Sequence, residues 1–364
     1  MPDQSSTSPS ARVAFGQGFL KDCWWFAALS GDLKAGKLQR YVFLGEPVLL
    51  GRDLDGKVYA IRDICPHRAA PLSAGQMLRE NGQCVVQCCY HGWTFDTAGT
   101  CRSVPSLTPD QPMDVEKIKV RGYEVREQQG IVWIYITSDV RRPEPPDHEP
   151  PVLPGVVGGG PIIVETMDFE SHIDHAVVGL MDPAHGPYVH QQWWWRSAKK
   201  QLSKIKDFEP REMGFAMVRH APSSNSRAYK ILGGAPATEI TFRLPGIRYE
   251  HIEIGRLQVL GLTCLTPIDD KATRITQIFW SDHGLFRLIA PVFRYGAKAF
   301  LKQDGDMVNL QNEGLKYDPA LLWIDDADTQ AKWYQQLKKE WMAARADKRP
   351  FVNPVKPATL KWTS

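Results

Sequence analysis

Four metal-ligating side chains stand in two short stretches of this sequence. The first stretch, CPHR, holds Cys65 and His67, and the second, CCYHGW, holds Cys88 and His91. Each stretch therefore offers one thiolate and one imidazole. Zinc fingers also use two cysteines and two histidines, but they usually place both cysteines on one loop and both histidines further along. One residue of each kind on both loops suits a [2Fe–2S] cluster, with the cysteines on one iron and the histidines on the other.

Spacing selects among the neighbouring cysteines. Cys88 lies three residues before His91, whereas Cys89 would leave a Cys-x-His spacing that is too short for such a loop, and Cys84 lies further upstream. We therefore predict that Cys88 is the ligand. A cluster with two cysteines and two histidines is a Rieske centre, in which neutral imidazoles raise the reduction potential so that the cluster accepts electrons readily.

The two loops, extended to CPHRAAPLSAG and CCYHGWTFD, resemble those of the oxygenase component of Rieske non-haem iron oxygenases. The resemblance extends to GKVYAIRDICPHR, to GIVWIYI and to the layout of the rest of the chain. It is strongest to the stand-alone subclass that includes vanillate O-demethylase and dicamba monooxygenase. The gap of twenty residues between His67 and Cys88 is slightly long for the family, and MLRENGQ within it predicts a hairpin insertion.

A Rieske cluster only transfers electrons, so chemistry on a substrate needs a second site. The stretch GLMDPAHGPYVHQQWWWR supplies Asp182, His185 and His190 in the family's Asp-x-x-His-x-x-x-x-His pattern. Two histidines and one carboxylate form the facial triad that holds Fe(II) and leaves positions open for oxygen. Five residues at 3.6 per turn would set the two histidines about 140° apart on a regular helix. We expect Gly186 and Pro187 to distort the helix, so that both histidines reach one metal.

Other residues near this motif have competing interpretations. Asp182 could cap the N-terminus of a helix that has Pro183 at its first position. A lone histidine is more often a packed side chain than a ligand, and we expect His172 and His175, which precede the matching motif, to be packing residues. The three tryptophans at 193–195 could form a pocket wall, but their size favours packing or a subunit contact.

The carboxylate of the triad is expected on a distant helix. The stretch LKQDGDMVNLQNEG offers Asp304 and Asp306, either of which could instead lie on a solvated helix face. The stand-alone subclass tends toward an aspartate followed seven residues later by glutamine, and Asp304 with Gln311 matches that pattern. The resemblance therefore implies that His185, His190 and Asp304 hold the mononuclear iron.

Two kinds of scaffold are predicted to position these residues. Short apolar runs separated by Gly-Glu-Pro and Asp-Gly turns predict strands through the first part of the chain, as far as GIVWIYI. A Pro- and Gly-rich segment then predicts a domain boundary. Helix signals surround 165–200, and helices are predicted from about 285 to the end. Strand-like runs between them lie at 213–220, 238–243, 250–265 and 273–281.

The fold class predicted from these elements is α+β, with a small all-β domain followed by a larger domain. The resemblance implies that the first is a Rieske [2Fe–2S] domain. It implies that the second is a catalytic domain of the helix-grip type, with an antiparallel sheet and covering helices. The predicted parts are a loose tail at 1–16, a segment at 17–40 that packs with the catalytic domain, the Rieske domain at 41–137, a linker at 138–161 and the catalytic mononuclear-iron domain at 162–364.

Composition excludes several classes of partner. The 364 residues carry a net charge of +3 with Lys and Arg scattered, so no basic footprint for nucleic acid or an anionic membrane is present. No window approaches 18 apolar residues, so no transmembrane helix is expected. The polar start MPDQSSTSPSAR shows no secretory signal. Seven cysteines without a regular framework suit a reducing cytoplasm, where spaced Cys and His more often mean metal than disulfide.

The resemblance implies an oxygenase. Electrons would enter the Rieske cluster, pass to Fe(II) and activate O2, to hydroxylate or oxidatively demethylate a hydrophobic or aromatic organic substrate. Monooxygenation or demethylation is favoured over cis-dihydroxylation. No nicotinamide or flavin motif is present, so a separate reductase, with or without a ferredoxin, must supply the electrons. Family members are commonly homotrimers, in which the residue that matches Asp182 reaches the partner subunit's His91 and carries electrons between the two metals.

Two other classes of protein remain as alternatives at this point. A Rieske electron-transfer protein without oxygenase chemistry would need neither the second set of ligands nor some 200 residues after the linker. A zinc-stabilised binding module would be colourless, whereas a Rieske protein is red-brown. Aromatic acids, alkaloids, terpenoids and sterols are all compatible with the sequence as substrates.

Overall fold

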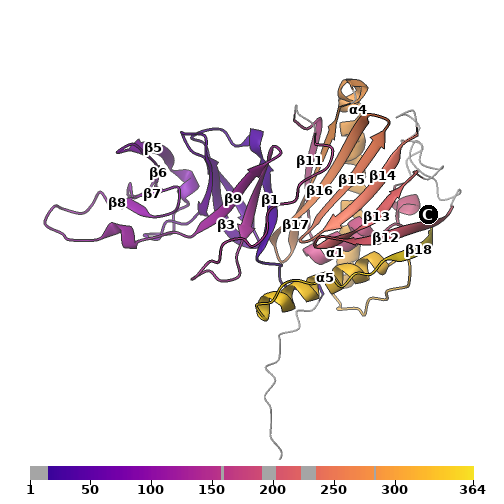
Figure 1. The fold of residues 1–364 in the computed structure, drawn as a ribbon. Helices are drawn as coiled ribbons and strands as arrows, with labels where there is room; N and C mark the ends of the chain where they lie inside the picture. The colour runs from indigo at the N-terminus through magenta and orange to yellow at the C-terminus, as the bar shows by residue number, and fades with distance from the viewer. Residues whose placement is uncertain (1–14, 157–159, 191–201, 223–234, 283) are drawn as a thin grey trace, which may run out of the picture. The chain divides into compact units, whose positions relative to one another are not determined.

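The computed structural model describes residues 15–156, 160–190, 202–222, 235–282 and 284–364. Most of the predicted tail, residues 1–14, lies outside this set. The chain divides into two compact units, which are described separately (Figure 1). One unit comprises Lys21–Gly160 together with Thr266–Asp269, and the other comprises the described residues up to Leu20, within Pro161–Leu265 and within Asp270–Ser364. Among the described residues, no helix is long and apolar enough to cross a membrane.

The first unit is built around a six-stranded sheet. Its strands, in spatial order, are β1 (Cys23–Leu29), β10 (Ile131–Ile136), β9 (Gly122–Gln128), β4 (Val58–Arg62), β3 (Glu46–Arg52) and β2 (Leu38–Phe43). Every residue of β1 and β10 is buried, as expected of the continuous apolar runs CWWFAAL and IVWIYI. Single-turn 3-10 helices at Ser30–Asp32, Leu72–Ala74 and Val115–Lys117 complete the unit.

Strand β1 differs from the expectation for segment 17–40. The sequence placed this segment with the catalytic domain, but β1 pairs with β10 in antiparallel register, with Trp24 opposite Tyr135. Only the start of the segment belongs to the second unit, where the backbone carbonyls of Gln17 and Gly18 accept from Lys338. The sequence could not show this, because the partner strand lies about a hundred residues away and an apolar run does not identify its neighbour.

A smaller four-stranded sheet carries the loop with Cys88 and His91, whereas the loop with Cys65 and His67 follows β4. The order of this sheet is β5 (Gln76–Glu80), β6 (Gln83–Gln87), β7 (Thr94–Asp96) and β8 (Cys101–Ser103), and the loop with Cys88 and His91 joins β6 to β7. Strands β5 and β6 form a hairpin whose two turn residues, Asn81 and Gly82, both have positive φ, at 49° and 81°. Asn-Gly is the favoured pair for such a turn. The predicted hairpin at MLRENGQ is therefore confirmed.

The second unit contains an eight-stranded antiparallel sheet. In spatial order its strands are β11 (Ile163–Phe169), β17 (Ala272–Ser281), β16 (Leu257–Asp269), β15 (Ile247–Ile254), β14 (Ala237–Arg243), β13 (Gly214–His220), β12 (Ser203–Arg211) and β18 (Ala358–Thr363). The helices described are α1 (Ile173–Met181), α2 (Gly186–Val189), α4 (Gly284–Leu315) and α5 (Thr329–Ala346).

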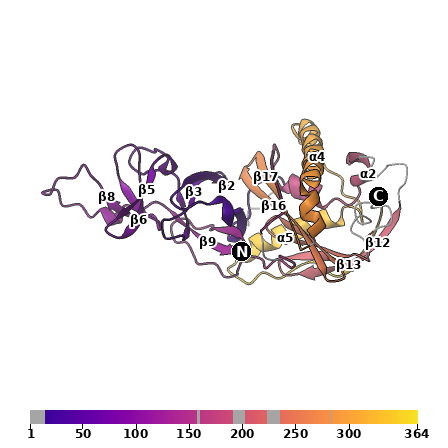
Figure 2. The ribbon, with the colours of Figure 1, turned by 90° about the horizontal axis from the view of Figure 1, so that it is seen from above.

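Helices α4 and α5 cover one face of this sheet, as the view from above shows (Figure 2). Trp333 of α5 packs against Phe208 and Phe215, with ring centroids 5.5 and 5.0 Å apart. Helix α4 approaches β11 so closely that a Cβ on Gly305 would lie 3.3 Å from the ring of Phe169. The expected α+β class, with an antiparallel sheet gripped by helices, is confirmed.

Three local expectations for the second unit were wrong. The run at 250–265 is two strands, β15 and β16, because Gly255 takes a positive φ of 60° and turns the chain between them. The helix signals around 165–200 begin after a strand, β11. The C-terminal part is not wholly helical, because β18 closes the edge of the sheet against β12. Strand β18 alternates apolar and polar residues over only six positions, and β12 does so irregularly, so both give weak strand signals.

A buried ion pair fastens α1 to α5. Asp174 is fully buried and accepts hydrogen bonds from Lys338 Nζ at 2.7 Å, Tyr334 Oη at 2.7 Å and the Gly16 backbone at 2.8 Å. Removing one partner of such a pair would leave an uncompensated buried charge, so this contact fixes the helix that precedes residues 182–190.

Candidate metal centres

Two tight loops hold the four residues of the first centre. In one loop the Cys65 amide donates to the Ala70 carbonyl at 2.8 Å, and in the other the Cys88 amide donates to the Trp93 carbonyl at 2.8 Å. Gly92 closes the second loop with a φ of 71°, a backbone conformation that residues other than glycine rarely adopt.

Asp63, two residues before Cys65, also holds the first loop in place. This carboxylate is fully buried and accepts from the backbone amide and the hydroxyl of Ser73, both at 2.7 Å. Arg40 adds an ion pair at 3.0 Å. The loop that carries Cys65 is therefore held at both of its ends, independently of any metal.

The thiols and imidazoles lie at different depths. Cys65 and Cys88 are both 2% exposed, in the apolar core that surrounds the loops. His67 is half-buried and His91 is exposed, with ring centroids 4.4 Å apart. Trp93 stacks on His67 at 4.7 Å. The site therefore has a buried thiol end and an exposed imidazole end.

The charge states of these residues suit a metal cluster. Burial raises the pKa of the Cys65 thiol to about 11, with the Cys88 thiol as a hydrogen-bonding neighbour. Two thiolates would be unstable there without a cation beside them. The pKa of His67 is lowered, first by desolvation and then by His91, which favours the neutral imidazole that binds metal. The donor set therefore fits a positively charged iron–sulfur core.

The four residues do not fit a single preformed zinc site. The structure describes two clusters in which three potential ligand atoms lie within 4.8 Å of one another. Among the described residues, Cys65, His67, Cys88 and His91 do not form such a cluster. Tetrahedral zinc needs all four donors to converge on one point, whereas a two-iron cluster needs a pair of thiols and a separate pair of imidazoles. The observed pairing favours the cluster.

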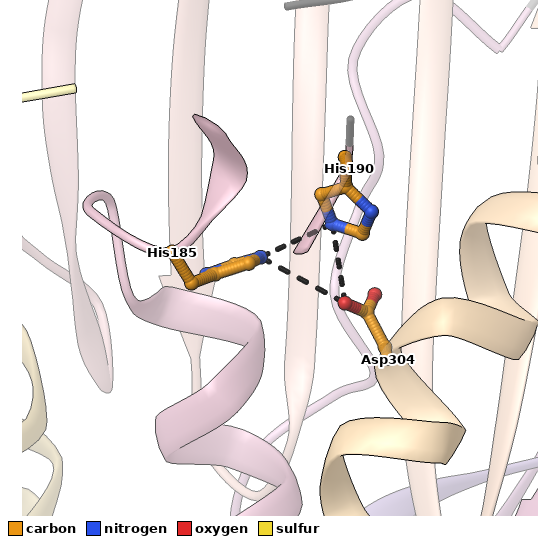
Figure 3. Close-up of side chains that lie close together, drawn as sticks. All are labelled: His185, His190 and Asp304. Carbon is orange, nitrogen blue, oxygen red and sulfur yellow. Dashed lines mark hydrogen bonds and ion pairs between the residues drawn. The ribbon is translucent and has the colours of Figure 1, made fainter. Parts of the chain in front are cut away.

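The second centre brings together the two residues that flank α2 and one residue of α4 (Figure 3). His185 Nε2 and His190 Nε2 lie 3.2 Å apart, and Asp304 Oδ1 lies 3.1 Å from His190 Nε2 and 3.8 Å from His185 Nε2. These atoms all fall within 4.8 Å of one another, which is the arrangement that one metal ion requires. Two imidazoles and one carboxylate on one side of an ion leave its other positions open, and suit Fe(II).

The two histidines meet because the helix between them is a single short turn. Helix α2 has four residues, and His185 and His190 flank it. His190 leaves helical geometry, with φ −101° and ψ 63°, so the two rings come within 5.1 Å centroid to centroid. The two rings meet as expected, but the chain departs from helical geometry at His190, whereas Gly186 and Pro187, where the distortion was expected, begin the short helix.

Asp182 does not have the helix-capping role that the sequence suggested. It lies at the C-terminal end of α1, where its amide donates to the Val178 carbonyl, and its Oδ1 accepts from the Ala184 amide at 2.7 Å. Its Oδ2 lies 3.6 Å from His185 Nδ1, a buried atom without a hydrogen-bond partner among the described residues. Burial would raise the pKa of Asp182, but the nearby His185 ring and the hydrogen bond from the Ala184 amide lower it overall. The carboxylate is thus ready to accept the Nδ1 proton.

His190 is held by two residues that sequence reasoning missed. Its ring is 1% exposed and stacks on Phe300 at 3.4 Å, and its Nδ1 lies 3.0 Å from Gln303 Oε1. Both residues belong to α4, four and one positions before Asp304. Helical spacing relative to Asp304 was a signal for Phe300, since residues four apart share a helix face, but it gave none for Gln303, which is adjacent to Asp304.

The rival candidates lie elsewhere. Asp306 is exposed and pairs with Lys302 at 2.7 Å. His172 caps the N-terminus of α1, and His175 packs edge-on against Phe15 at 4.9 Å. Gln311, which the subclass pattern used, is exposed. The tryptophans at 193–195 lie outside the described residues.

A second cluster with metal-ligand spacing contains Asp53, Asp55 and Cys84. Its carboxylates already have partners: Asp53 Oδ1 accepts from the amides of Asp55 and Lys57, and Asp55 forms an ion pair with Arg79 at 2.5 Å. The guanidinium of Arg79 therefore occupies the position that a metal ion would take, and the three residues stabilise the hairpin.

Known proteins resemble this chain in sequence and in fold. The Rieske [2Fe-2S] domain family matches residues 23–124, a range that begins in β1. The chain is 31% identical over 376 residues to 4β-methylsterol monooxygenase of Methylococcus capsulatus, covering 95% of this chain and 96% of that protein. It is 34% identical over 177 residues to the oxygenase component of dicamba O-demethylase of Stenotrophomonas maltophilia, covering 48% of each.

Solved structures show the same fold. The crystal structure of dicamba monooxygenase bound to dicamba superposes with a TM-score of 0.73 at 23% identity, covering 90% of this chain and 99% of that one. At this identity the likeness concerns the fold, which includes both units of the chain.

Proposed function

The chain belongs to the Rieske oxygenase family, and on this premise we propose that it hydroxylates or oxidatively demethylates a hydrophobic or aromatic substrate through the residues described above. The protein is an oxygenase of the monooxygenase and demethylase type, with a [2Fe–2S] cluster and a non-haem iron. In the proposal, Cys65, His67, Cys88 and His91 hold the cluster. His185, His190 and Asp304 hold the iron.

The observation that carries the proposal is the convergence of three ligand atoms in the second unit. Nothing in electron transfer alone requires two histidines and a carboxylate within 4.8 Å of one another. The cluster supplies electrons, and the iron supplies the activation of O2. The chain's own residues hold the two groups, orient the rings of His185 and His190, and shield His190 from water.

Asp182 is proposed to work between the two centres. Its carboxylate accepts the Nδ1 proton of His185, which fixes the ring and leaves Nε2 for the iron. In a trimer of the kind common in the family, the same carboxylate would reach the partner subunit's His91. The exposure of His91 supports this, because only an exposed imidazole can be contacted from outside its own unit.

The remaining parts of the proposal concern organisation and partners. We propose the Rieske domain at 41–137, extended by β1, the linker at 138–161 and the catalytic domain at 162–364. Electrons come from a separate reductase, with or without a ferredoxin, and the assembly is a homotrimer. All seven cysteines are free of disulfides, which supports a reducing compartment such as the cytoplasm.

The substrate is proposed to be apolar, with a methyl or methoxy group at the reacting position. The relative that spans nearly the whole chain is named for a methylsterol, and another is named for the demethylation of dicamba. The test is oxygen consumption by the purified protein with a surrogate reductase, in a panel of methylsterols, terpenoids, alkaloids and methoxylated aromatic acids. His190→Ala is the matched control.

We expect at least one apolar class to accelerate oxygen consumption and to yield a product that contains an oxygen atom from O2 or lacks a methyl group. The control should show neither. If the protein exchanges electrons with the reductase but every substrate leaves both variants equally slow, the electron-transfer alternative would replace the proposal.

A further inference from the structure

Three side chains of one helix surround the ring of His190. Phe300, Gln303 and Asp304 occupy positions i, i+3 and i+4 of α4, so they project from the same face. Phe300 stacks on the ring with centroids 3.4 Å apart, Gln303 faces Nδ1 at 3.0 Å, and Asp304 faces Nε2 at 3.1 Å. One helix therefore defines the plane of this ring and contacts both of its nitrogens.

The location of the proton on His190 follows from these contacts. The ring turns Nε2 toward His185 and Asp304, so Nε2 is the atom that would bind iron. A neutral imidazole that binds metal through Nε2 carries its proton on Nδ1. That proton needs an acceptor, and because His190 is 1% exposed the acceptor must come from the protein. The side-chain oxygen of Gln303 is at hydrogen-bond distance.

We propose that Gln303 is a positioning residue that fixes His190 with its proton on Nδ1 and its Nε2 toward the iron. The inference rests on the proposed iron site and adds to it. It also makes the two iron-binding histidines unequal: His185 faces the carboxylate of Asp182, whereas His190 faces a neutral amide. An anionic acceptor makes an imidazole a stronger donor to its metal than a neutral one does.

The test compares Fe(II) affinity in variants at position 303, measured by competition with a chelator in protein that retains its cluster. Gln303→Leu keeps the size of the side chain but removes the acceptor. Gln303→Glu keeps an acceptor in the same place and adds charge. The matched control is Asp306→Asn, which changes an exposed residue two positions beyond the ligand on the same helix.

We expect Gln303→Leu to weaken Fe(II) binding about 10- to 100-fold, as loss of a partner to a ligating histidine does. Gln303→Glu should bind Fe(II) at least as tightly as the wild type, and Asp306→Asn should be unchanged. Cluster absorption should be equal in all four proteins, which shows that none has failed to assemble.

Two outcomes would overturn the inference. Wild-type Fe(II) affinity in Gln303→Leu would show that His190 needs no acceptor, and equal weakening in the Leu and Glu variants would show that the side chain acts only by packing. The proposed function is tested separately by His190→Ala. If His190→Ala keeps its iron, the iron site itself is wrong. If His190→Ala loses its iron but Gln303→Leu binds Fe(II) as tightly as the wild type, only the positioning role of Gln303 is rejected.

Discussion

Cys88 and Cys89 are neighbours with the same side chain and opposite surroundings. Cys88 is 2% exposed beside Cys65, whereas Cys89 is exposed. The spacing to His91 had favoured Cys88, and burial gives a second, independent reason for that choice. Local spacing of this kind is what a sequence predicts well, because a loop of four residues leaves little freedom in where its side chains point.

Cys88→Ser should abolish the visible absorption and the electron-spin signal of the cluster, because the hydroxyl of serine is a poor ligand for iron in this setting. Cys89→Ser should keep both signals. Absorption and low-temperature electron paramagnetic resonance on the two purified variants make the comparison. The reverse pattern would mean that the neighbouring cysteine is the ligand.

Asp304→Ala should lose the mononuclear iron while the cluster remains, because it removes the one anionic ligand of the triad. Asp306→Ala, on the exposed side of the same helix, should keep both. Iron per cluster, determined after gel filtration, separates the two results. Full iron content and activity in Asp304→Ala would move the third ligand elsewhere.

Asp182→Asn should assemble and keep a reducible cluster, yet reoxidise it at least tenfold more slowly when O2 and substrate are present. The amide keeps the shape of the side chain but removes its charge and one acceptor. Single-turnover reoxidation of the reduced protein is the measurement. A wild-type rate would leave Asp182 as no more than the end of α1.

At the scale of elements, prediction from the sequence ends where partners are distant in the chain. The cluster loops and the distorted turn at His185 and His190 are set by adjacent residues, and they were predicted. The pairing of β1 with β10 and of β18 with β12 was not, because each depends on a strand more than a hundred residues away. Gln303 was missed for the same reason: its contact with His190 spans 113 positions.

The N-terminus of α1 contains a pH-sensitive contact. His172 Nδ1 accepts from the Asp174 amide at 3.2 Å, and its Nε2 lies 3.1 Å from the Gly18 carbonyl, so the neutral ring satisfies both groups. The pKa of His172 is lowered, mainly by burial, although Asp174 opposes the shift. Below about pH 6.5, His172 therefore binds a proton more readily in the unfolded chain than in the folded chain. The free energy of unfolding should then rise with pH in that range.

His172→Asn should make that pH dependence shallower, because asparagine caps a helix as well but does not titrate. Urea unfolding of both proteins at pH 7.5 and pH 5.5 gives the comparison. Part of the slope should remain, since burial also lowers the pKa values of His175 and His220. An unchanged slope would show that His172 is protonated equally in the folded and unfolded chains.

At the scale of the whole molecule, the proposal places a cluster and an iron of different subunits in one electron path. This predicts complementation between two inactive chains. Cys88→Ser lacks a cluster but keeps the iron, and Asp304→Ala has the opposite defect. If electrons pass between neighbours in a ring, mixed trimers should recover activity, about a quarter of the wild-type value for random mixing.

The measurement is turnover by co-expressed chains, with each variant alone as the control. Activity in the mixture that is no greater than in the separate variants would mean that electrons pass within one chain, and the role of Asp182 between subunits would fall with it.

Gly305 has a consequence for anyone who would redesign this enzyme by laboratory evolution. It lies where the turn of α4 that carries Asp304 approaches β11: a methyl group there would meet the ring of Phe169 at 3.3 Å and the sulfur of Met167 at 3.5 Å. Larger side chains at positions 169 or 167 would therefore displace the helix turn that carries Asp304. Such substitutions would move Asp304 relative to His185 and His190, whereas smaller residues at 169 or 167 would tolerate alanine at 305.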